Sequence, residues 1–426
     1  MTLRLSAAGA ILSACVLTWA LQGDQTRRIP SHLALYGLAF AGYLLTLHPG
    51  RLSRRGLRLC LGLALVWRLV LAAAPPLLSD DVYRYAWEGR IQLHGGNPYA
   101  WRDRPEAAKW AALRDRVWDK VNHKDYTAVY PPLWQLAARG VAAIRDSVTA
   151  MKVFIVVCEA LTLAVLARLL ALRGLPAERL LIQAWSPLAL VEIAGSGHNE
   201  ALGMLFVALA LLALETGRPF LSALAAAMGV QVKLLPGLLA AAWARRYRVW
   251  HAALALAAAA VLVVPYMGAR SGLWRSLGAY AVYWRFNETI FAALVALFGV
   301  PLAHGVAAMT LGALSLFLAW RGVEPAAAAL AVTCAWLLVS PNVLPWYALW
   351  LLPLLVLRDS PGALLFTGSV ALAYLVYPQW LSGGRWWLGW PIRALEYLPC
   401  VALAVAAMWR SRRRAPRTLT VADCMP

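Results

Sequence analysis

The chain has 426 residues, of which 62% are hydrophobic and 14% are charged, whereas a soluble protein carries roughly a quarter charged residues. This composition excludes an ordinary soluble domain, and the recurring apolar runs of membrane-spanning length predict an all-α polytopic membrane protein. The net charge of +20 does not indicate nucleic-acid binding, because the arginines cluster at the ends of apolar runs, a pattern typical of cytoplasmic loops. The clusters are Arg51, Arg54, Arg55 and Arg58; Arg168, Arg173 and Arg179; Arg245, Arg246 and Arg248; and Arg410, Arg412, Arg413 and Arg414.

The apolar runs predict a bundle of about 14 transmembrane helices. In chain order they lie near residues 5–21, 31–47, 57–75, 147–170, 179–194, 200–214, 218–232, 235–244, 249–266, 302–320, 324–340, 346–357, 361–377 and 392–409. We interpret the first run as a retained signal anchor, because no convincing cleavage site follows it. The runs at 235–244 and 346–357 are shorter than the roughly 20 residues of a full crossing and follow proline-containing breaks, so we expect broken helices there.

A long polar segment, 76–130, interrupts these runs. If the N-terminus is cytoplasmic, all four arginine clusters are cytoplasmic too, and the polar segment lies on the opposite face with the loops at 195–199, 267–301 and 378–391. Two amphipathic or short apolar segments, 131–144 and 289–300, are predicted to be interfacial helices. We expect residues 1–410 to form one membrane domain and residues 411–426 to form a basic, disordered cytoplasmic tail.

An acidic pair, Asp80 and Asp81, opens the polar segment directly after a predicted span. Carboxylates at a bilayer boundary are costly unless they are solvated or paired. If a helix starts at Asp80, then Asp81, Arg84, Tyr85 and Glu88 lie on one face. Asp81 could act as a general base, and Arg84 could keep it ionised or bind a phosphate. Alternatively, one carboxylate, Asp80 above all, would only cap the helix.

Four polar residues lie beside or within the later apolar runs. His198, Asn199 and Glu200 occupy a tight turn between two predicted spans, where they either face the same cavity as Asp81 or form only a polar turn. Lys233 is one of five lysines and sits in the apolar stretch V-Q-V-K-L-L-P-G. An intramembrane cation is a functional candidate and could bind a phosphate, although a lysine can also extend its amine to the membrane surface.

The remaining candidates fall in outer-face segments near the C-terminal half. They are Arg285 in W-R-F-N-E, and Asn342, Trp346 and Tyr347 in S-P-N-V-L-P-W-Y. Aromatic rings beside Arg and Asn suit stacking on a sugar and recognition of its hydroxyls, although most of the 21 tryptophans fit an interfacial belt. The sequence contains no glycine-rich nucleotide motif and no His/Cys metal spacing, so neither a cofactor nor a metal is predicted.

The order of these motifs resembles that of bacterial GT-C glycosyltransferases. The relevant stretches are D-D-V-Y-R-Y-A-W-E-G-R-I-Q, G-N-P-Y, Y-P-P, G-H-N-E and a K-x-x-P break, and they are similar to those of polyprenol-phosphomannose-dependent mannosyltransferases. The resemblance implies a GT-C-like helical bundle with its catalytic Asp in the first large outer loop. This chain departs from many members by placing three spans before that loop, and its Glu200 stands where the family often has Asp.

The residue patterns and the resemblance together give three groups of candidate site residues. They are Asp81 and Asp80 as catalytic groups; Lys233, Arg84 and Arg285 at the donor phosphate; and Glu88, His198, Asn199, Glu200, Asn342, Trp346 and Tyr347 at the sugar or acceptor.

The predicted function is transfer of a hexose, mannose by resemblance, from a polyprenyl-phosphate donor to a hydroxyl of an envelope glycolipid, polysaccharide or protein. The enzyme would be a multi-pass protein of the bacterial inner membrane, with its active site facing the periplasm or cell exterior and both termini cytoplasmic. A secondary transporter or lipid-linked sugar flippase is the alternative, and it would place ionisable residues at mid-membrane in pseudo-symmetric halves. A structural envelope subunit would instead tolerate substitution of Asp81 and Lys233.

Overall fold

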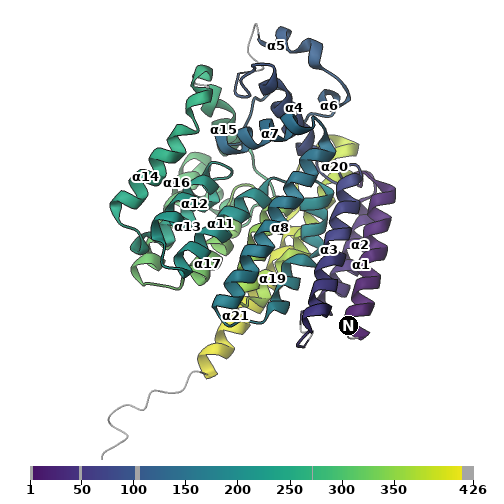
Figure 1. The fold of residues 1–426 in the computed structure, drawn as a ribbon, viewed down its shortest axis with the longest axis vertical. Coiled ribbons are helices and arrows are strands. Elements are labelled where there is room, and N and C mark those ends of the chain that lie inside the picture. The colour runs from purple at the N-terminus through teal and green to yellow at the C-terminus, as the bar shows by residue number, and fades with distance from the viewer. Residues whose placement is uncertain (1–2, 48–49, 101–105, 271, 415–426) are drawn as a thin grey trace, which may run out of the picture.

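The computed structural model describes residues 3–47, 50–100, 106–270 and 272–414. All the regular elements in these ranges are helices or helical turns (Figure 1). The first half contains α1 (Leu3–Gln22), α2 (Ile29–Leu44), α3 (Arg54–Ala73), α4 (Asp81–Leu93), α5 (Glu106–Lys109), η1 (Ala111–Leu113), α6 (Arg116–Asp119), α7 (Pro132–Ile144), α8 (Val148–Leu172), η2 (Ala177–Leu180), α9 (Leu181–Ala184), α10 (Pro187–Ala189), η3 (Leu190–Gly195) and α11 (Glu200–Glu215).

The second half continues in the same way. It contains α12 (Pro219–Val230), α13 (Leu235–Ala242), η4 (Ala244–Arg246), α14 (Val249–Val261), η5 (Val264–Ala269), α15 (Gly272–Tyr283), α16 (Ile290–Trp320), α17 (Pro325–Val339), η6 (Pro345–Trp350), α18 (Leu351–Leu357), α19 (Pro361–Ser369), η7 (Val370–Leu375), α20 (Val376–Gly383) and α21 (Trp390–Arg414).

Six stretches of the described chain are long and apolar enough to cross a membrane. They are α1, α3, α8, α16, the stretch from α19 to α20, and α21 as far as Arg410. A seventh would be the pair formed by the α10–η3 segment and α11, which is bent by 119°. The expected all-helical membrane architecture is confirmed, whereas six or seven long spans with several shorter apolar helices do not confirm a number near 14.

Several predicted spans are broken more sharply than their hydropathy indicates. The run at 179–194 is divided among η2, α9, α10 and η3, because Pro187 cannot continue the preceding turn and starts a new one. The two segments 289–300 and 302–320 form α16, with a kink where Gly299 takes a positive φ of 74°. At the C-terminus α21 continues to Arg414, so the first residues of the predicted tail are helical, and residues 415–426 lie outside the described chain.

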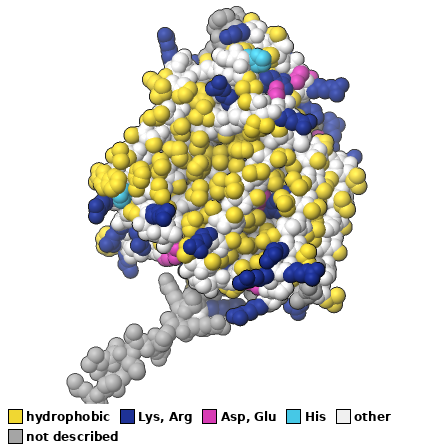
Figure 2. Space-filling view, viewed as in Figure 1, with side chains coloured by type: hydrophobic (Ala, Val, Ile, Leu, Met, Phe, Trp, Pro, Cys, Tyr) yellow, Lys and Arg dark blue, Asp and Glu magenta, His cyan; other side chains and the backbone are white. Residues whose placement is uncertain are grey.

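The two ends of the bundle differ in chemistry. The N-terminus and the end of α21 lie at one end, and α4 to α7 lie at the other (Figure 1). At the first end Arg173 pairs with Glu215 (2.7 Å) and Glu324 (2.8 Å), and Arg245 donates to the Trp320 carbonyl oxygen. Between the ends, one face of the surface is a broad apolar area with basic side chains above and below it (Figure 2). This distribution matches a bundle that crosses a bilayer.

The outer segment is anchored by close packing of α4 against α7. A Cβ at Gly89 of α4 would lie 2.5 Å from the Ala138 carbonyl oxygen and 3.2 Å from the Ala142 Cβ. The two helices therefore approach more closely than any side chain at position 89 would allow. Because Asp81 starts α4, this contact fixes where the acidic pair sits relative to α7.

Buried charges join α3 to α8 beneath the acidic pair. Arg68 of α3 makes a bidentate ion pair with Glu159 of α8, at 2.6 and 2.7 Å. Lys152 of α8 is also fully buried and donates to the carbonyl oxygens of Leu71 and Ala74 (2.7 Å each). Since the last carbonyls of a helix have no partner within it, Lys152 caps the end of α3 just before the chain reaches Asp80.

Candidate active site

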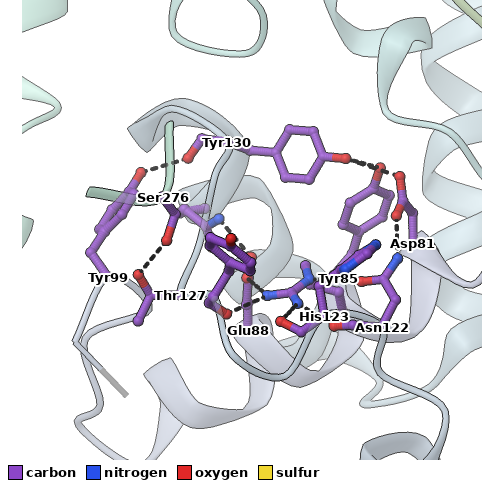
Figure 3. Close-up of polar contacts among 12 residues, drawn as sticks. Asp81, Tyr85, Glu88, Tyr99, Asn122, His123, Thr127, Tyr130 and Ser276 are labelled. Carbon is purple, nitrogen blue, oxygen red and sulfur yellow. Dashed lines mark hydrogen bonds and ion pairs between the residues drawn. The ribbon is translucent and has the colours of Figure 1, made fainter. Parts of the chain in front are cut away.

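The acidic pair lies at the start of α4, with Asp80 at the N-cap position and Asp81 as the first helical residue. The side-chain amide of Asn122 donates to Asp81 Oδ1 (2.6 Å), as Figure 3 shows. The same amide donates to Asp80 Oδ1 (2.7 Å), so one amide holds both carboxylates. The Asp80 side chain makes no capping hydrogen bond to α4. The interpretation of Asp80 as only a helix cap is therefore wrong in this structure; Ser79 Oγ accepts from the Asp81 N–H instead (3.3 Å).

Tyr130 links Asp81 to Lys233. Its hydroxyl donates to Asp81 Oδ2 (3.0 Å) and accepts from the Tyr85 hydroxyl (3.2 Å), as Figure 3 shows. The face of the same ring lies 4.9 Å from Lys233 Nζ, within cation–π range. Lys233 also donates to the buried Glu200 carboxylate (Oε1, 2.7 Å). The carboxylate and the lysine predicted from sequence thus belong to one polar cluster.

Arg84 lies on the same helix as Asp81, and its contacts are with the 122–126 loop and with Glu88. Its guanidinium donates to the side chain and carbonyl oxygen of Asn122, to the carbonyl oxygens of His123 and Tyr126, and to Glu88 Oε1. These contacts use all five of its N–H donors. In this conformation Arg84 has no donor left for a phosphate, and it instead holds the 122–126 loop that presents the Asn122 amide to the two aspartates.

Glu88 lies beneath this loop and is fully buried. Its Oε2 accepts from Gln135 Nε2 of α7 (2.8 Å), and its Oε1 faces Arg84 (3.4 Å). Burial raises the pKa of Glu88 to about 7, against the opposing effect of the Arg84 charge. Burial, followed by repulsion from Asp81, likewise raises the pKa of Asp80 to about 6. Glu88 thus supports α4 from behind and does not line the space in front of Asp81.

His198 lies behind Asp81 in the turn between η3 and α11. Its ring is fully buried and stacks on Trp346, with 4.0 Å between the ring centroids. Its Nδ1 lies 3.9 Å from Asp81 Oδ2, and its Nε2 lies 3.3 Å from Glu192 Oε2. The neighbouring Asn199 is also fully buried, and its side-chain atoms make no hydrogen bond within the protein.

The other predicted sugar-binding residues form a wall next to Lys233. Asn342 Nδ2 donates to the Tyr280 hydroxyl (2.7 Å), which is hydrogen-bonded to the Tyr347 hydroxyl. The Tyr347 ring lies 5.6 Å from Lys233 Nζ. Tyr280 belongs to α15, so a helix of the outer region is tied directly to the predicted site. Rings and amides arranged in this way suit the faces and hydroxyls of a sugar.

Arg285 is less closely connected. It pairs with its neighbour Glu288 (2.9 Å), and its side chain is one-third exposed. The adjoining Phe286 exchanges backbone hydrogen bonds with the segment that carries Asn342: Phe286 N donates to the Pro341 carbonyl oxygen (3.0 Å), and Val343 N donates to that of Phe286 (2.9 Å). Arg285 therefore lies near the aromatic wall, but its guanidinium is already paired with the Glu288 carboxylate.

Sequence reasoning overlooked Asn122, Glu192 and Tyr280 and treated Tyr130 only as the start of a helix. Glu192 carried a usable signal, because it is the one acid in the apolar run L-A-L-V-E-I-A, and an ionisable residue inside a span is a functional candidate. Asn122 and Tyr280 carried none, since their roles depend on contacts with residues 42 and 62 positions away. No group of three or more His, Cys, Asp or Glu side chains with the arrangement of a metal site occurs among the described residues.

An all-helical membrane protein with a carboxylate pair, a lysine and an aromatic wall at one end has the features of a membrane-embedded glycosyltransferase. The model of the family described as alpha-(1->6)-mannopyranosyltransferase, N-terminal domain, matches residues 5–246, more than half of the chain, and the chain belongs to this family. A similar curated protein is the probable alpha-(1->6)-mannopyranosyltransferase of Mycolicibacterium smegmatis (strain ATCC 700084 / mc(2)155), which is 25% identical over 448 residues, covering 89% of this chain and 78% of the relative. No solved structure matches.

These findings confirm the expected resemblance to the GT-C mannosyltransferases and the assignment as a glycosyltransferase. They favour a mannosyltransferase over the transporter or flippase considered as the alternative.

Proposed function

We propose that this protein transfers mannose from a polyprenyl-phosphate donor to a hydroxyl of an envelope glycoconjugate, with Asp81 as the general base. The observation that carries the proposal is the direct connection of Asp81 to Lys233 through Tyr130. It puts a proton acceptor at the hydroxyl of one tyrosine and a cation that can bind phosphate over the face of the same ring. Such a pair can serve the two ends of the reaction, the attacking hydroxyl and the leaving phosphate.

Asp81 is the better of the two base candidates. Both its oxygens accept hydrogen bonds, from Asn122 and Tyr130, which fixes the orientation of the carboxylate. Asp80 accepts a hydrogen bond from the same Asn122 amide, and burial followed by repulsion from Asp81 raises its pKa to about 6. Asp80 therefore begins to take up a proton at a higher pH than an ordinary aspartate, and a protonated carboxylic acid cannot accept the proton of the acceptor hydroxyl.

Lys233 is suited to bind the phosphate because Glu200 balances its charge while its side chain stays accessible to a ligand. Glu200 and the rings of Tyr130 and Tyr347 hold the ammonium group, and its side chain remains partly exposed. Lysine binds phosphate as a point charge. As the phosphate leaves, Lys233 would stabilise the charge that develops on its oxygens.

The site faces the outside of the cytoplasmic membrane in this proposal. The arginine-rich end of the bundle would lie in the cytoplasm, as positive charge does in short loops, so the end with α4 to α7 would face the periplasm or cell exterior. The family description and the relative's name suggest that the bond formed is an alpha-(1->6) mannosidic linkage.

Transfer from radiolabelled polyprenyl-phosphate-mannose in membranes tests the proposal. Asp81→Asn should lower transfer at least about 100-fold, the usual scale for loss of a general base, whereas Asp119→Asn, on the same outer segment, should leave it unchanged. Lys233→Met should raise the KM for the donor. Full transfer by the Asp81→Asn variant would exclude Asp81 as the base, and absence of transfer by folded wild-type protein from this donor would contradict the donor assignment.

A further inference from the structure

Glu192 is a buried carboxylate that the proposed reaction does not yet use. It lies in η3, a π-helical turn, and its side chain is fully buried. A π-helical turn inserts an extra residue into a helix, redirects its side chains and occurs frequently at functional sites. Here it turns Glu192 toward the segment that carries His198, whose backbone N–H donates to the Glu192 carbonyl oxygen (3.0 Å).

Both carboxylate oxygens of Glu192 face possible donors. The Tyr374 hydroxyl donates to Oε1 (2.5 Å), and His198 Nε2 lies 3.3 Å from Oε2. Tyr374 cannot reverse this arrangement if the carboxylate is ionised, because an ionised carboxylate only accepts. The Glu192 oxygens therefore favour a proton on His198 Nε2.

A proton on Nε2 leaves Nδ1 of a neutral imidazole as an acceptor. That nitrogen lies 3.9 Å from Asp81 Oδ2, and the ring cannot easily turn away because it is stacked on Trp346. Neither ring nitrogen makes a hydrogen bond in this structure, and Glu192 Oε2 makes none either, so both nitrogens lie close to carboxylate oxygens without a formed hydrogen bond. Catalytic hydrogen bonds are often long before substrate binds and shorten in the complex.

We propose that Glu192 and His198 form a proton relay behind Asp81, with Glu192 as the positioning residue that fixes the His198 tautomer. This inference rests on the proposed function, since it takes Asp81 to be the base. It extends the site from α4 into the membrane-embedded π-helical turn.

The relay balances the protons of the transfer. The acceptor O–H bond breaks and its electron pair forms the new bond to C1 of mannose, while the bond from C1 to the phosphate oxygen breaks with its electrons on that oxygen. The proton passes to Asp81 Oδ2 and then to His198 Nδ1, forming an imidazolium that the Glu192 carboxylate stabilises. After the products leave, the proton returns through Asp81 to water at the outer face.

Other charged and titratable groups surround the relay and contribute to its pH dependence. Beyond Asp81 and Glu192, they are Asp80 before α4, Tyr130, Lys152 of α8, which packs beside Gly197, Tyr374 of η7, and the Glu200–Lys233 pair.

The pH profile of transfer at saturating donor tests the relay, in membranes that hold the full chain and its own acceptors, with radiolabelled polyprenyl-phosphate-mannose. The relay needs neutral His198 as the proton acceptor, and the negative charge of Glu192 beside Nε2 favours the protonated ring, so the acidic limb of the profile reports on this pair. Glu192→Gln should therefore lower the maximal rate about tenfold or more and move the acidic limb of the profile to lower pH, with the donor KM unchanged. Tyr43→Phe is the control. It removes a buried hydroxyl that donates to the Ile182 carbonyl oxygen, and it should change neither the maximal rate nor the acidic limb.

A second variant separates a relay from a general packing defect. His198→Gln should also lower the rate and move the acidic limb down, and the Glu192→Gln/His198→Gln double variant should be no slower than His198→Gln alone, because the two residues act through one another. A rate loss without movement of the limb, or additive losses, would overturn the relay while loss of activity in Asp81→Asn still supported the proposed function. An active Asp81→Asn would remove the base and the relay together.

Discussion

Glu88 supports helix α4 from behind, and its contribution to the stability of the protein depends on pH. Because burial raises its pKa to about 7, above the usual value near 4.3 in an unfolded chain, the folded state holds a proton that the unfolded state has lost between these pH values. The contribution of Glu88 to stability is therefore fully present at low pH and is lost as the pH rises toward 7. The raised pKa of Asp80, about 6, acts in the same direction over a lower window.

Glu88→Gln should flatten the upper part of this pH dependence. Between pH 6 and 7 wild-type protein should lose stability with a slope of up to about 1.4 kcal/mol per pH unit, and the variant should lose less, since its amide does not titrate. The thermal midpoint in detergent at pH 5, 6, 7 and 8 measures this. Asp80→Asn is the matched control, because it should flatten only the window below about pH 6. Equal slopes in wild type and Glu88→Gln would contradict the assignment.

The residues differ in how far the sequence predicted them. The face shared by Asp81, Arg84 and Glu88 follows from helical spacing and is present in α4. The use of Arg84 to hold the 122–126 loop could not be predicted, because its partners are backbone carbonyls about 40 positions away. Glu192 was predictable in kind, as an acid in an apolar run, but not in its contact with His198, which depends on a π-helical turn.

At the scale of elements, the position of Asp81 depends on how closely α4 packs on α7. The sequence predicted both helices from their polar and amphipathic patterns: one that starts at Asp80 and one at 131–144. It could not predict their contact, since Gly89 looks like any other helical glycine until the Ala138 carbonyl is placed against it. The same limit applies to the broken run at 179–194, where hydropathy is continuous but the backbone is not.

Gly89→Ala tests this contact. A Cβ at 2.5 Å from a backbone oxygen forces the helices apart, which should cost about 1–3 kcal/mol of stability and lower mannose transfer by displacing Asp81. Gly140→Ala in α7 is the matched control, because its Cβ would meet no atom within 4 Å, and alanine favours the helix by up to about 1 kcal/mol. Thermal midpoints and transfer rates should fall for the first variant only; equal behaviour of the two would contradict the role of the contact.

At the scale of the whole molecule, the short loops carry clusters of arginine, whereas the outer segment mixes basic and acidic residues. Sequence reasoning predicted the end at which the arginines gather, since the positions of short basic loops follow from hydropathy alone. The number of full crossings could not be predicted in the same way, because apolar helices such as α12, α14 and α17 are shorter than a full crossing, and such helices are tolerated where protein surrounds them.

Single cysteines test the orientation of the bundle. In a Cys424→Ser background, where most of the other cysteines are buried, Ser382→Cys in α20 should react with a membrane-impermeant maleimide on intact cells, because position 382 is exposed at the end with the site. Arg218→Cys, exposed at the opposite end, should react only after the membrane is opened. The reverse pattern would place the site in the cytoplasm.

The Arg68–Glu159 pair also bears on how the chain enters the membrane. Arg68 belongs to α3, and its partner belongs to α8, which the ribosome completes only after the whole outer segment between them has been made. An arginine without a partner is costly inside a span, and Arg68 lies in the last third of α3, which ends at Ala73. Insertion of α3 would therefore become more favourable once α8 is made, because the two spans could then enter the lipid as a neutral pair.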